Sequence, residues 1–255
     1  MIKLSYKKFW FIPTIEYYYW YDNKSFWIFD IITISQLPNK INNKSFKEST
    51  FNTWITNLWE DLELLFNSFS KTTRNEIRRA EKEWITYYIE KDPNENDLLE
   101  YLDFYNRFLK TKHLPTITSE NILKYIWNIF LTYSKINEDI LSYHLYIYDL
   151  SIKKVRLLHS CSLFRQKNEW KEFVNLIWYA NKGLHYWDMK YFKDNWFIEY
   201  DWWWLYLWEA DKQKVNIDKF KLSFSPNIVE HYNYEKIPFI LELLYKIKLY
   251  LWKIF

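Results

Sequence analysis

The sequence predicts an α/β protein (in the α+β sense), with one domain built on a central mixed β-sheet that is flanked by helices. Segments with the apolar pattern of strands come between segments with the apolar period of helices along the chain. No repeat of fixed period and no Pro- or Ser-rich linker interrupts the 255 residues. We therefore expect one domain over residues 1–235, followed by an amphipathic C-terminal helix over residues 236–255.

The N-terminal half is expected to begin with strands and to continue with helices. Residues 11–21 and 25–35 are aromatic-rich alternating runs joined by Asp22-Asn23-Lys24, which is a hairpin pattern. Residues 62–83 change to a helical period, and residues 85–90 follow as a strand. Two further helical segments are expected within residues 94–134.

The C-terminal half is expected to complete the sheet around one long helix. In chain order, its elements are strands 139–148 and 153–164, a long helix 169–194, strand 197–201, a short helix 216–224, strand 227–234 and the C-terminal helix. That last helix has a broad apolar face with lysines at its flanks. It either packs on its own domain or lies at a membrane interface.

Charge and cysteine content exclude several classes of protein. The formal net charge is +3, from 35 basic and 32 acidic residues, which is too balanced for nucleic-acid binding by bulk electrostatics. The single cysteine, Cys161, excludes an internal disulfide and is expected to be a buried thiol in a reducing compartment. No signal peptide and no run of 18 uncharged apolar residues is found, so a cytoplasmic location is expected.

Tryptophan and glycine occur in unusual numbers. The chain has 16 tryptophans and one glycine, Gly183, where typical usage would give roughly 18 glycines. Trp84 and Trp196 close helical runs directly before strands, where helices usually end in a left-handed glycine. Trp202, Trp203 and Trp204 follow the expected strand end at Asp201. We hypothesise that many of these codons are UGA, written here as Trp but read as Gly in the source cell; the alternative is a surface of real tryptophans.

Four local motifs are specific enough to compare with known families: TRNEIRRAEKEW, LIWYANKGLHYWDMKYFKDNW, YDWWW and IDKFKLSF. They resemble motifs of the FemA/FemB/FemX peptidyltransferase-like family, within the GCN5-related acyltransferase (GNAT) superfamily. The family patterns are roughly R-x-x-I-R-x-A-x-x-x-G, I-G-x-A-N-x-x-L-H, Y-D-[FW]-G-G and F-K-x-x-F-G. The resemblance covers about residues 55–235, and Ser225-Pro226 departs from it where the family usually has glycine. The family's glycines fall on Trp84, Trp178, Trp196, Trp203 and Trp204.

The resemblance implies a GNAT-like fold and the transfer of an aminoacyl group from aminoacyl-tRNA to an amine of a peptidoglycan precursor. Relatives use other acyl donors, and well-studied members carry two copies of the domain where this chain has length for one, so acyl-CoA stays open as donor. The expected partners are an envelope glycan or a lipid-linked precursor, with no tightly bound cofactor and no metal. The alternative is a non-enzymatic carbohydrate-binding protein that presents real tryptophans to sugars.

Three residues are the candidates for catalysis. Lys221 matches the lysine of the F-K-x-x-F motif, where the resemblance implies a cation that stabilises an oxyanion at the donor carbonyl. Asp201 ends a strand, where an open sheet forms its ligand crevice. His185 is a proton acceptor near neutral pH, on one helix face with Asn181 and Asp188.

Substrate binding is assigned to that helix face and to basic side chains. Asn181 and Asp188 are expected to orient the acceptor. Arg74 and Arg78 lie on a basic helical patch that would hold phosphates. Arg165 opens a segment that weakly resembles the pyrophosphate loop of acyl-CoA enzymes. For every one of these residues a purely structural role is the alternative.

Overall fold

The structure is a computed structural model that describes residues 2–8, 12–19, 30–162, 171–205 and 212–238, with the isolated positions 241 and 243. Within these ranges there are ten strands and six helices. The chain divides into two compact units, residues 1–52 with 230–255 and residues 53–229. The boundary expected at residue 235 stays a prediction, and nearly all of the expected C-terminal helix lies outside the described residues.

The larger unit, residues 53–229, confirms the predicted mixed sheet flanked by helices. Its strands run in the order β4-β9-β8-β7-β6-β5, and β8 and β9 are parallel whereas their other pairings are antiparallel. The strands are β4 (Lys47–Asn57, of which residues 53–57 belong to this unit), β5 (Thr86–Lys91), β6 (Ile129–Ile136), β7 (Asp139–Asp149), β8 (Lys154–Ser162) and β9 (Glu199–Trp204). The helices are α1 (Leu62–Ser68), α2 (Lys71–Lys82), α3 (Glu95–Thr111), α4 (Glu120–Leu123), α5 (Lys171–Asp194) and α6 (Lys212–Leu222).

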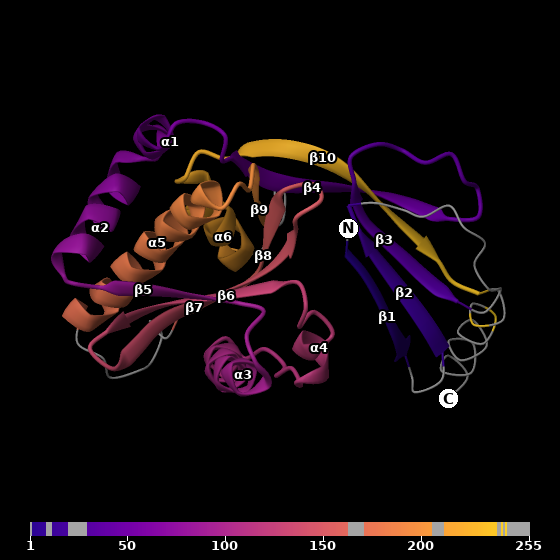
Figure 1. The fold of residues 1–255 in the computed structure, drawn as a ribbon, viewed down its shortest axis with the longest axis horizontal. Coiled ribbons are helices and arrows are strands. Elements are labelled where there is room, and N and C mark those ends of the chain that lie inside the picture. The colour runs from indigo at the N-terminus through magenta and orange to yellow at the C-terminus, as the bar shows by residue number, and fades with distance from the viewer. Residues whose placement is uncertain are drawn as a thin grey trace. The chain divides into compact units, whose positions relative to one another are not determined.

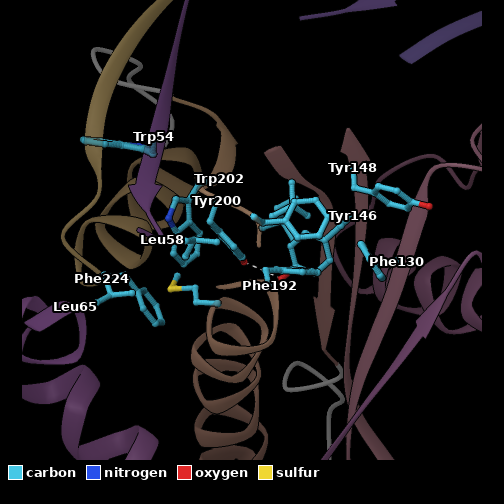
Figure 2. Packing of buried hydrophobic residues seen from close by; sticks show 14 of the residues in the cluster. Trp54, Leu58, Leu65, Phe130, Tyr146, Tyr148, Phe192, Tyr200, Trp202 and Phe224 are labelled. Carbon is cyan, nitrogen blue, oxygen red and sulfur yellow. Dashed lines mark hydrogen bonds between the residues drawn. The ribbon is translucent and has the colours of Figure 1, made fainter. Parts of the chain in front are cut away.

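The helices of this unit lie on both sides of the sheet (Figure 1). Helix α5 contacts β6, β7 and β8 on the side where α2 also lies, and α3 contacts β8 on the other side. Because side chains alternate along a strand, Tyr200 and Trp202 of β9 face α5 while Asp201 between them faces away. The core beneath α5 is rich in aromatic side chains, and Tyr146, Phe192, Tyr200, Trp202 and Phe224 are buried together in it (Figure 2).

The smaller unit contradicts the predicted N-terminal hairpin. Its strands are β1 (Ile2–Lys8), β2 (Ile12–Tyr18), β3 (Ile31–Leu37) and most of β10 (Asn227–Lys236), in the order β1-β2-β3-β10. Strands β2 and β3 pair in parallel, so no tight turn joins them, and β2 finds its antiparallel neighbour in β1. The connection from Tyr18 to Ile31 is long enough for a parallel pairing, which a two- or three-residue turn would forbid.

Strand β6 lies where the sequence predicted a helix. The only helix within residues 119–134 is the short α4. Strand β6 begins at Ile129 and lies between β5 and β7. The residues from Ile129 to Thr132 are all buried. A strand that is buried on both faces has a continuous apolar run, which periodicity cannot distinguish from a buried helix. Strand β4 was also missing from the prediction.

Two of the anomalous tryptophans adopt the conformation of a helix-ending glycine. Trp84 and Trp196 have φ of 60° and 67° and follow the last turns of α2 and α5. After α5, the Trp196 amide donates to the Lys193 carbonyl and the Phe197 amide to the Phe192 carbonyl, both at 3.0 Å. The amides of Trp84 and the next residue make the corresponding bonds after α2. This is the Schellman ending, whose left-handed position is usually glycine.

The indoles at these two positions contribute little packing. Trp84 is 86% exposed and Trp196 is 79% exposed. A non-glycine residue pays a steric penalty in the left-handed region, and neither side chain recovers it by burial. The local geometry therefore supports glycine at both positions.

Of the three consecutive tryptophans, only Trp202 is a core residue. Trp202 is 1% exposed and its Nε1 donates to the Thr56 hydroxyl at 2.9 Å. Trp203 has φ of 62°, and Trp204 is 45% exposed. Trp203 and Trp204 are thus not both buried in the core, as the hypothesis of glycine at these positions requires. Strand β9 continues to Trp204, so the strand end expected at Asp201 was wrong.

The single glycine lies where a side chain would not fit. A Cβ on Gly183 would overlap the hydroxyl of Tyr87 and would come within 3.1 Å of the Ala80 Cβ. Gly183 is thus required by the close packing of α5 on α2 and on β5, unlike the left-handed positions at which this chain carries tryptophan.

Substitution Trp202→Ala is expected to lower the free energy of unfolding by about 3–5 kcal/mol, because it empties a large site in the core. The measurement is urea denaturation followed by circular dichroism. Trp127, which is 80% exposed, is the matched control, and Trp127→Ala is expected to change stability by no more than about 0.5 kcal/mol. Equal effects of the two substitutions would show that Trp202 is not a core residue.

Candidate functional site

The candidate site lies where the parallel strands β8 and β9 separate. Their ladder pairs three positions, of which the last is Arg156 with Asp201, and within the described residues it goes no further. Beyond that rung, β8 continues to Ser162 and β9 to Trp204. Ligands of open α/β sheets bind outside the carboxyl ends of strands, where neighbouring strands diverge. By this rule, the divergence of β8 and β9 is where a substrate of the larger unit is expected to bind.

Lys221 of α6 is buried at the carboxyl end of β9. Its Nζ donates to the carbonyl oxygen of Trp204 at 2.7 Å. Burial lowers the pKa of Lys221 to about 8, although the carboxylates of Asp218 and Asp201 oppose the shift. Lys221 and Asp201 thus interact electrostatically at the same end of β9, and the catalytic role of each stays a prediction.

Asp201 is fully buried and anchors the end of its strand. One of its carboxylate oxygens accepts hydrogen bonds from the Thr53 hydroxyl at 2.5 Å and from the Trp203 amide at 2.7 Å. The other lies 3.8 Å from Nζ of Lys154. These bonds favour the structural alternative for Asp201. They also hold Trp203 in its left-handed conformation.

Two of the predicted catalytic residues, His185 and Asp201, lie on opposite faces of β9. His185 packs on Tyr200 and Trp202, whose side chains are on the α5 face of β9, whereas Asp201 points to the opposite face. Burial, and next the neighbouring His144, lower the pKa of His185 well below its ordinary value. His185 is therefore neutral at physiological pH and suits hydrogen bonding better than the proton uptake near neutral pH that we expected.

Asn181 and Asp188 do share a face of α5 with His185, and all three are buried. A fourth residue, His144 of β7, joins them: its Nδ1 is 2.7 Å from a carboxylate oxygen of Asp188, and its Nε2 is 3.0 Å from the side-chain oxygen of Asn181. Sequence reasoning missed His144. The signal was a histidine in an apolar strand, at even spacing from Tyr146, which shares the face toward α5.

His144, His185 and Asp188 offer ligand atoms within 4.8 Å of one another, which raises the question of a metal. Both nitrogens of His144 already contact oxygens. The two imidazole rings are stacked, with centroids 3.9 Å apart and planes at 28°, so their in-plane lone pairs do not converge on one point. The geometry favours a hydrogen-bond network, and the absence of a metal stays a prediction.

The predicted phosphate-binding arginines are engaged in packing. The Arg74 guanidinium donates to the carbonyls of Asn67 and Phe69, which end α1. The Arg78 guanidinium stacks over the Phe66 ring at 5.2 Å. Both residues therefore join α1 to α2, and their binding role stays a prediction. Arg165 lies outside the described residues.

Another buried lysine, Lys182, was missed by sequence reasoning. Its Nζ lies 2.5 Å from a carboxylate oxygen of Glu76 and 3.1 Å from the Thr73 hydroxyl, both on α2. The same carboxylate accepts a hydrogen bond from the indole of Trp178. These contacts fix α5 against α2 beside the α6 helix.

Comparisons with known proteins agree on the fold. No family model and no curated protein matches the sequence. FemX is similar in structure with a TM-score of 0.61 at 15% identity, over 84% of this chain and 74% of that one. The chain has a FemX-like fold.

Two further structures share this FemX-like fold. The C-terminal DUF2156 domain of a protein described as a lysylphosphatidylglycerol synthetase, from Agrobacterium fabrum, gives a TM-score of 0.57 at 10% identity, over 82% of this chain and 68% of that one. L-PGS from Bacillus licheniformis gives 0.52 at 11% identity, over 86% and 71%. At such identities the likeness concerns the fold alone. Among the helices described in this FemX-like chain, none is long and apolar enough to cross a membrane.

Proposed function

We propose that the protein is an N-acyltransferase that moves an aminoacyl or acyl group from a carrier to an amine on a cell-envelope precursor. The observation that carries the proposal is the buried ammonium of Lys221 at the divergence of β8 and β9. The FemX-like fold and the likeness to lysylphosphatidylglycerol synthetases support it. A FemAB-type enzyme in the cytoplasm is the specific form that we propose.

The chemistry requires little covalent participation by the protein. The acceptor amine attacks the donor carbonyl, a C–N bond forms, and the ester C–O or thioester C–S bond to the carrier breaks. The amine proton goes to the departing oxygen or sulfur, directly or through solvent. Lys221 carries three N–H donors, so it can hold the Trp204 carbonyl and still donate to the developing oxyanion.

Donor identity is tested with a protein that has glycine at positions 84, 178, 196, 203 and 204. Aminoacyl-tRNA mimics with a non-hydrolysable amide link and non-hydrolysable acyl-CoA analogues are titrated separately by calorimetry. Binding of either class supports acyl transfer and selects the donor. Binding of neither, by a protein that is folded, contradicts the proposal.

The rate is expected to fall as the pH rises through about 8. The protonated form of Lys221 stabilises the oxyanion, and burial lowers the pKa of this lysine to about 8. Above that pH each further unit should reduce kcat/KM about tenfold. The pH–rate profile of Lys221→Arg, which stays charged, should lack this descending limb. If the rate of Lys221→Arg falls with the same midpoint pH as that of the parent protein, the titrating group is not Lys221.

Contact with the inner membrane face belongs to the same proposal, because a lipid-linked acceptor would have to be reached there. We expect the full chain to sediment with anionic vesicles, less so at high salt, and no longer after deletion of residues 237–255. Sedimentation unchanged by the deletion would assign these residues to the protein's own core.

Exposed indoles favour one competing function, carbohydrate binding. Trp59, Trp84, Trp127 and Trp196 are all largely exposed. Two of the four, however, occupy left-handed helix ends. The codons decide between the functions: UGA at positions 203 and 204 supports the enzyme, and UGG supports a protein that stacks sugars on real tryptophans.

A further inference from the structure

A chain of buried hydrogen bonds links Asp188 to His185. The Tyr146 hydroxyl lies 2.5 Å from a carboxylate oxygen of Asp188. It also lies 2.8 Å from the hydroxyl of Tyr200, beside which it is buried in Figure 2. The Tyr200 hydroxyl in turn lies 2.8 Å from Nδ1 of His185. All four side chains are completely buried. These hydrogen bonds therefore connect Asp188 of α5, through Tyr146 of β7 and Tyr200 of β9, to His185 of α5, and none of the four side chains is exposed to solvent.

The order of donors and acceptors fixes where each proton lies. Burial raises the pKa of Asp188, and hydrogen bonds from His144, Tyr146 and Thr132 oppose that rise by stabilising the carboxylate. With Asp188 ionised, its carboxylate accepts and Tyr146 donates its single proton to it. Tyr146 can then only accept from Tyr200, and Tyr200 can only accept from His185. Nδ1 of His185 must accordingly carry a proton.

The other nitrogen of His185 is left with a free lone pair. Burial and the neighbouring His144, Lys221 and Lys182 all lower the pKa of His185, so the ring is neutral and Nε2 is unprotonated. Nε2 is buried, and it has no hydrogen-bond partner among the described residues. A buried polar atom without a partner is costly. An orphaned acceptor in this position therefore indicates a ligand that donates a hydrogen bond.

Aromatic side chains surround His185. The ring packs on Trp202, Phe220 and Phe224, with centroids 4.7, 5.4 and 5.6 Å away. Trp178 lies two turns earlier on the same face of α5, and its indole also packs on Phe220, at 5.6 Å. If residue 178 is glycine in the source cell, the volume of that indole is open beside Phe220.

We propose that Tyr146, Tyr200 and Asp188 are positioning residues that hold His185 as the neutral tautomer protonated at Nδ1, so that Nε2 accepts a hydrogen bond from the N–H of the acceptor amine. The proposal rests on the proposed acyl transfer for the identity of the ligand. The tautomer itself follows from the hydrogen bonds and from the neutrality of the buried ring, without reference to a substrate. The two parts can therefore fail separately.

The tautomer is tested by nitrogen NMR of the full chain labelled with ¹⁵N-histidine, with His185→Asn used to assign the signal. We expect His185 to be neutral and protonated at Nδ1 at pH 7. Tyr200→Phe removes the acceptor and should transfer the proton partly or wholly to Nε2. Tyr146→Phe, which shortens the chain by one hydroxyl, serves if Tyr200→Phe does not fold.

Tyr148→Phe is the matched control, because Tyr148 lies on the same strand and its hydroxyl bonds to Asp92, outside the chain of bonds. It should leave the His185 signal unchanged. The positioning role is overturned if His185 of the parent protein is charged or carries its proton on Nε2. It is also overturned if neither Tyr200→Phe nor Tyr146→Phe changes the tautomer.

The amine contact is tested by kinetics on the protein with glycine at position 178. Tyr200→Phe should raise KM for the amine acceptor about tenfold, the value of one hydrogen bond, with the donor KM unchanged. An unchanged acceptor KM together with the expected NMR result rejects the amine contact and keeps the tautomer. Absence of any transfer in the parent protein would instead reject the proposed function.

Discussion

Lys221→Met is expected to reduce turnover by about 10²-fold or more, the usual loss when one oxyanion-stabilising donor is removed. Methionine fills the buried volume of the lysine stem, so the fold should be retained. The measurement is the initial rate of acyl transfer at saturating donor, with circular dichroism as the check on folding. KM for the donor should change much less than kcat, because the interaction forms mainly in the transition state.

Lys219→Met is the matched control, since Lys219 is an exposed lysine on the same helix. Its turnover should stay within a few-fold of the parent protein. If Lys221→Met folds and its turnover is also within a few-fold, Lys221 has no part in the chemistry and only supports the end of β9.

Combined replacement of Trp84, Trp196 and Trp203 by glycine is expected to raise the free energy of unfolding by roughly 3 kcal/mol. Each position has a positive φ, which costs a non-glycine residue about 1–2 kcal/mol and glycine very little. The gain is reduced by the greater freedom of glycine in the unfolded chain. Guanidinium denaturation at constant m-value measures the difference.

The control for the glycine series is Trp127→Gly. Trp127 is as exposed as Trp84 and Trp196 but has no positive φ, so its replacement should give no gain. A triple variant that is no more stable than the parent would remove the physical argument for glycine at these positions. A gain from Trp127→Gly of the same size would attribute the effect to loss of an exposed indole.

Elements with a clear helical period, or with strand runs bounded by polar turns, were predictable from the sequence. Helix α5 and strands β5, β7 and β8 lie within a few residues of their predicted bounds. Strand β6 was not predictable, because burial on both faces removes the alternation that distinguishes a strand. The parallel pairing of β2 with β3 depends on contacts between strands, which local patterns do not encode.

The candidate site was predictable only within single elements. Helical spacing placed Asn181, His185 and Asp188 on one face, and the structure confirms that arrangement. Tyr146 and Tyr200 reach that face from two different strands, through sheet order and register. The same register turns Asp201 away from His185, which no spacing in the sequence could indicate.

The central claim, acyl transfer assisted by Lys221, is tested most directly by following a labelled group from donor to product. The protein with glycine at positions 84, 178, 196, 203 and 204 is incubated with radiolabelled aminoacyl-tRNA or acyl-CoA and an envelope-precursor fraction. We predict label in an amide-linked product that resists mild alkali, and about 10²-fold slower labelling with Lys221→Met. No amide-linked label from either donor, with a folded protein and an intact precursor fraction, would contradict the account.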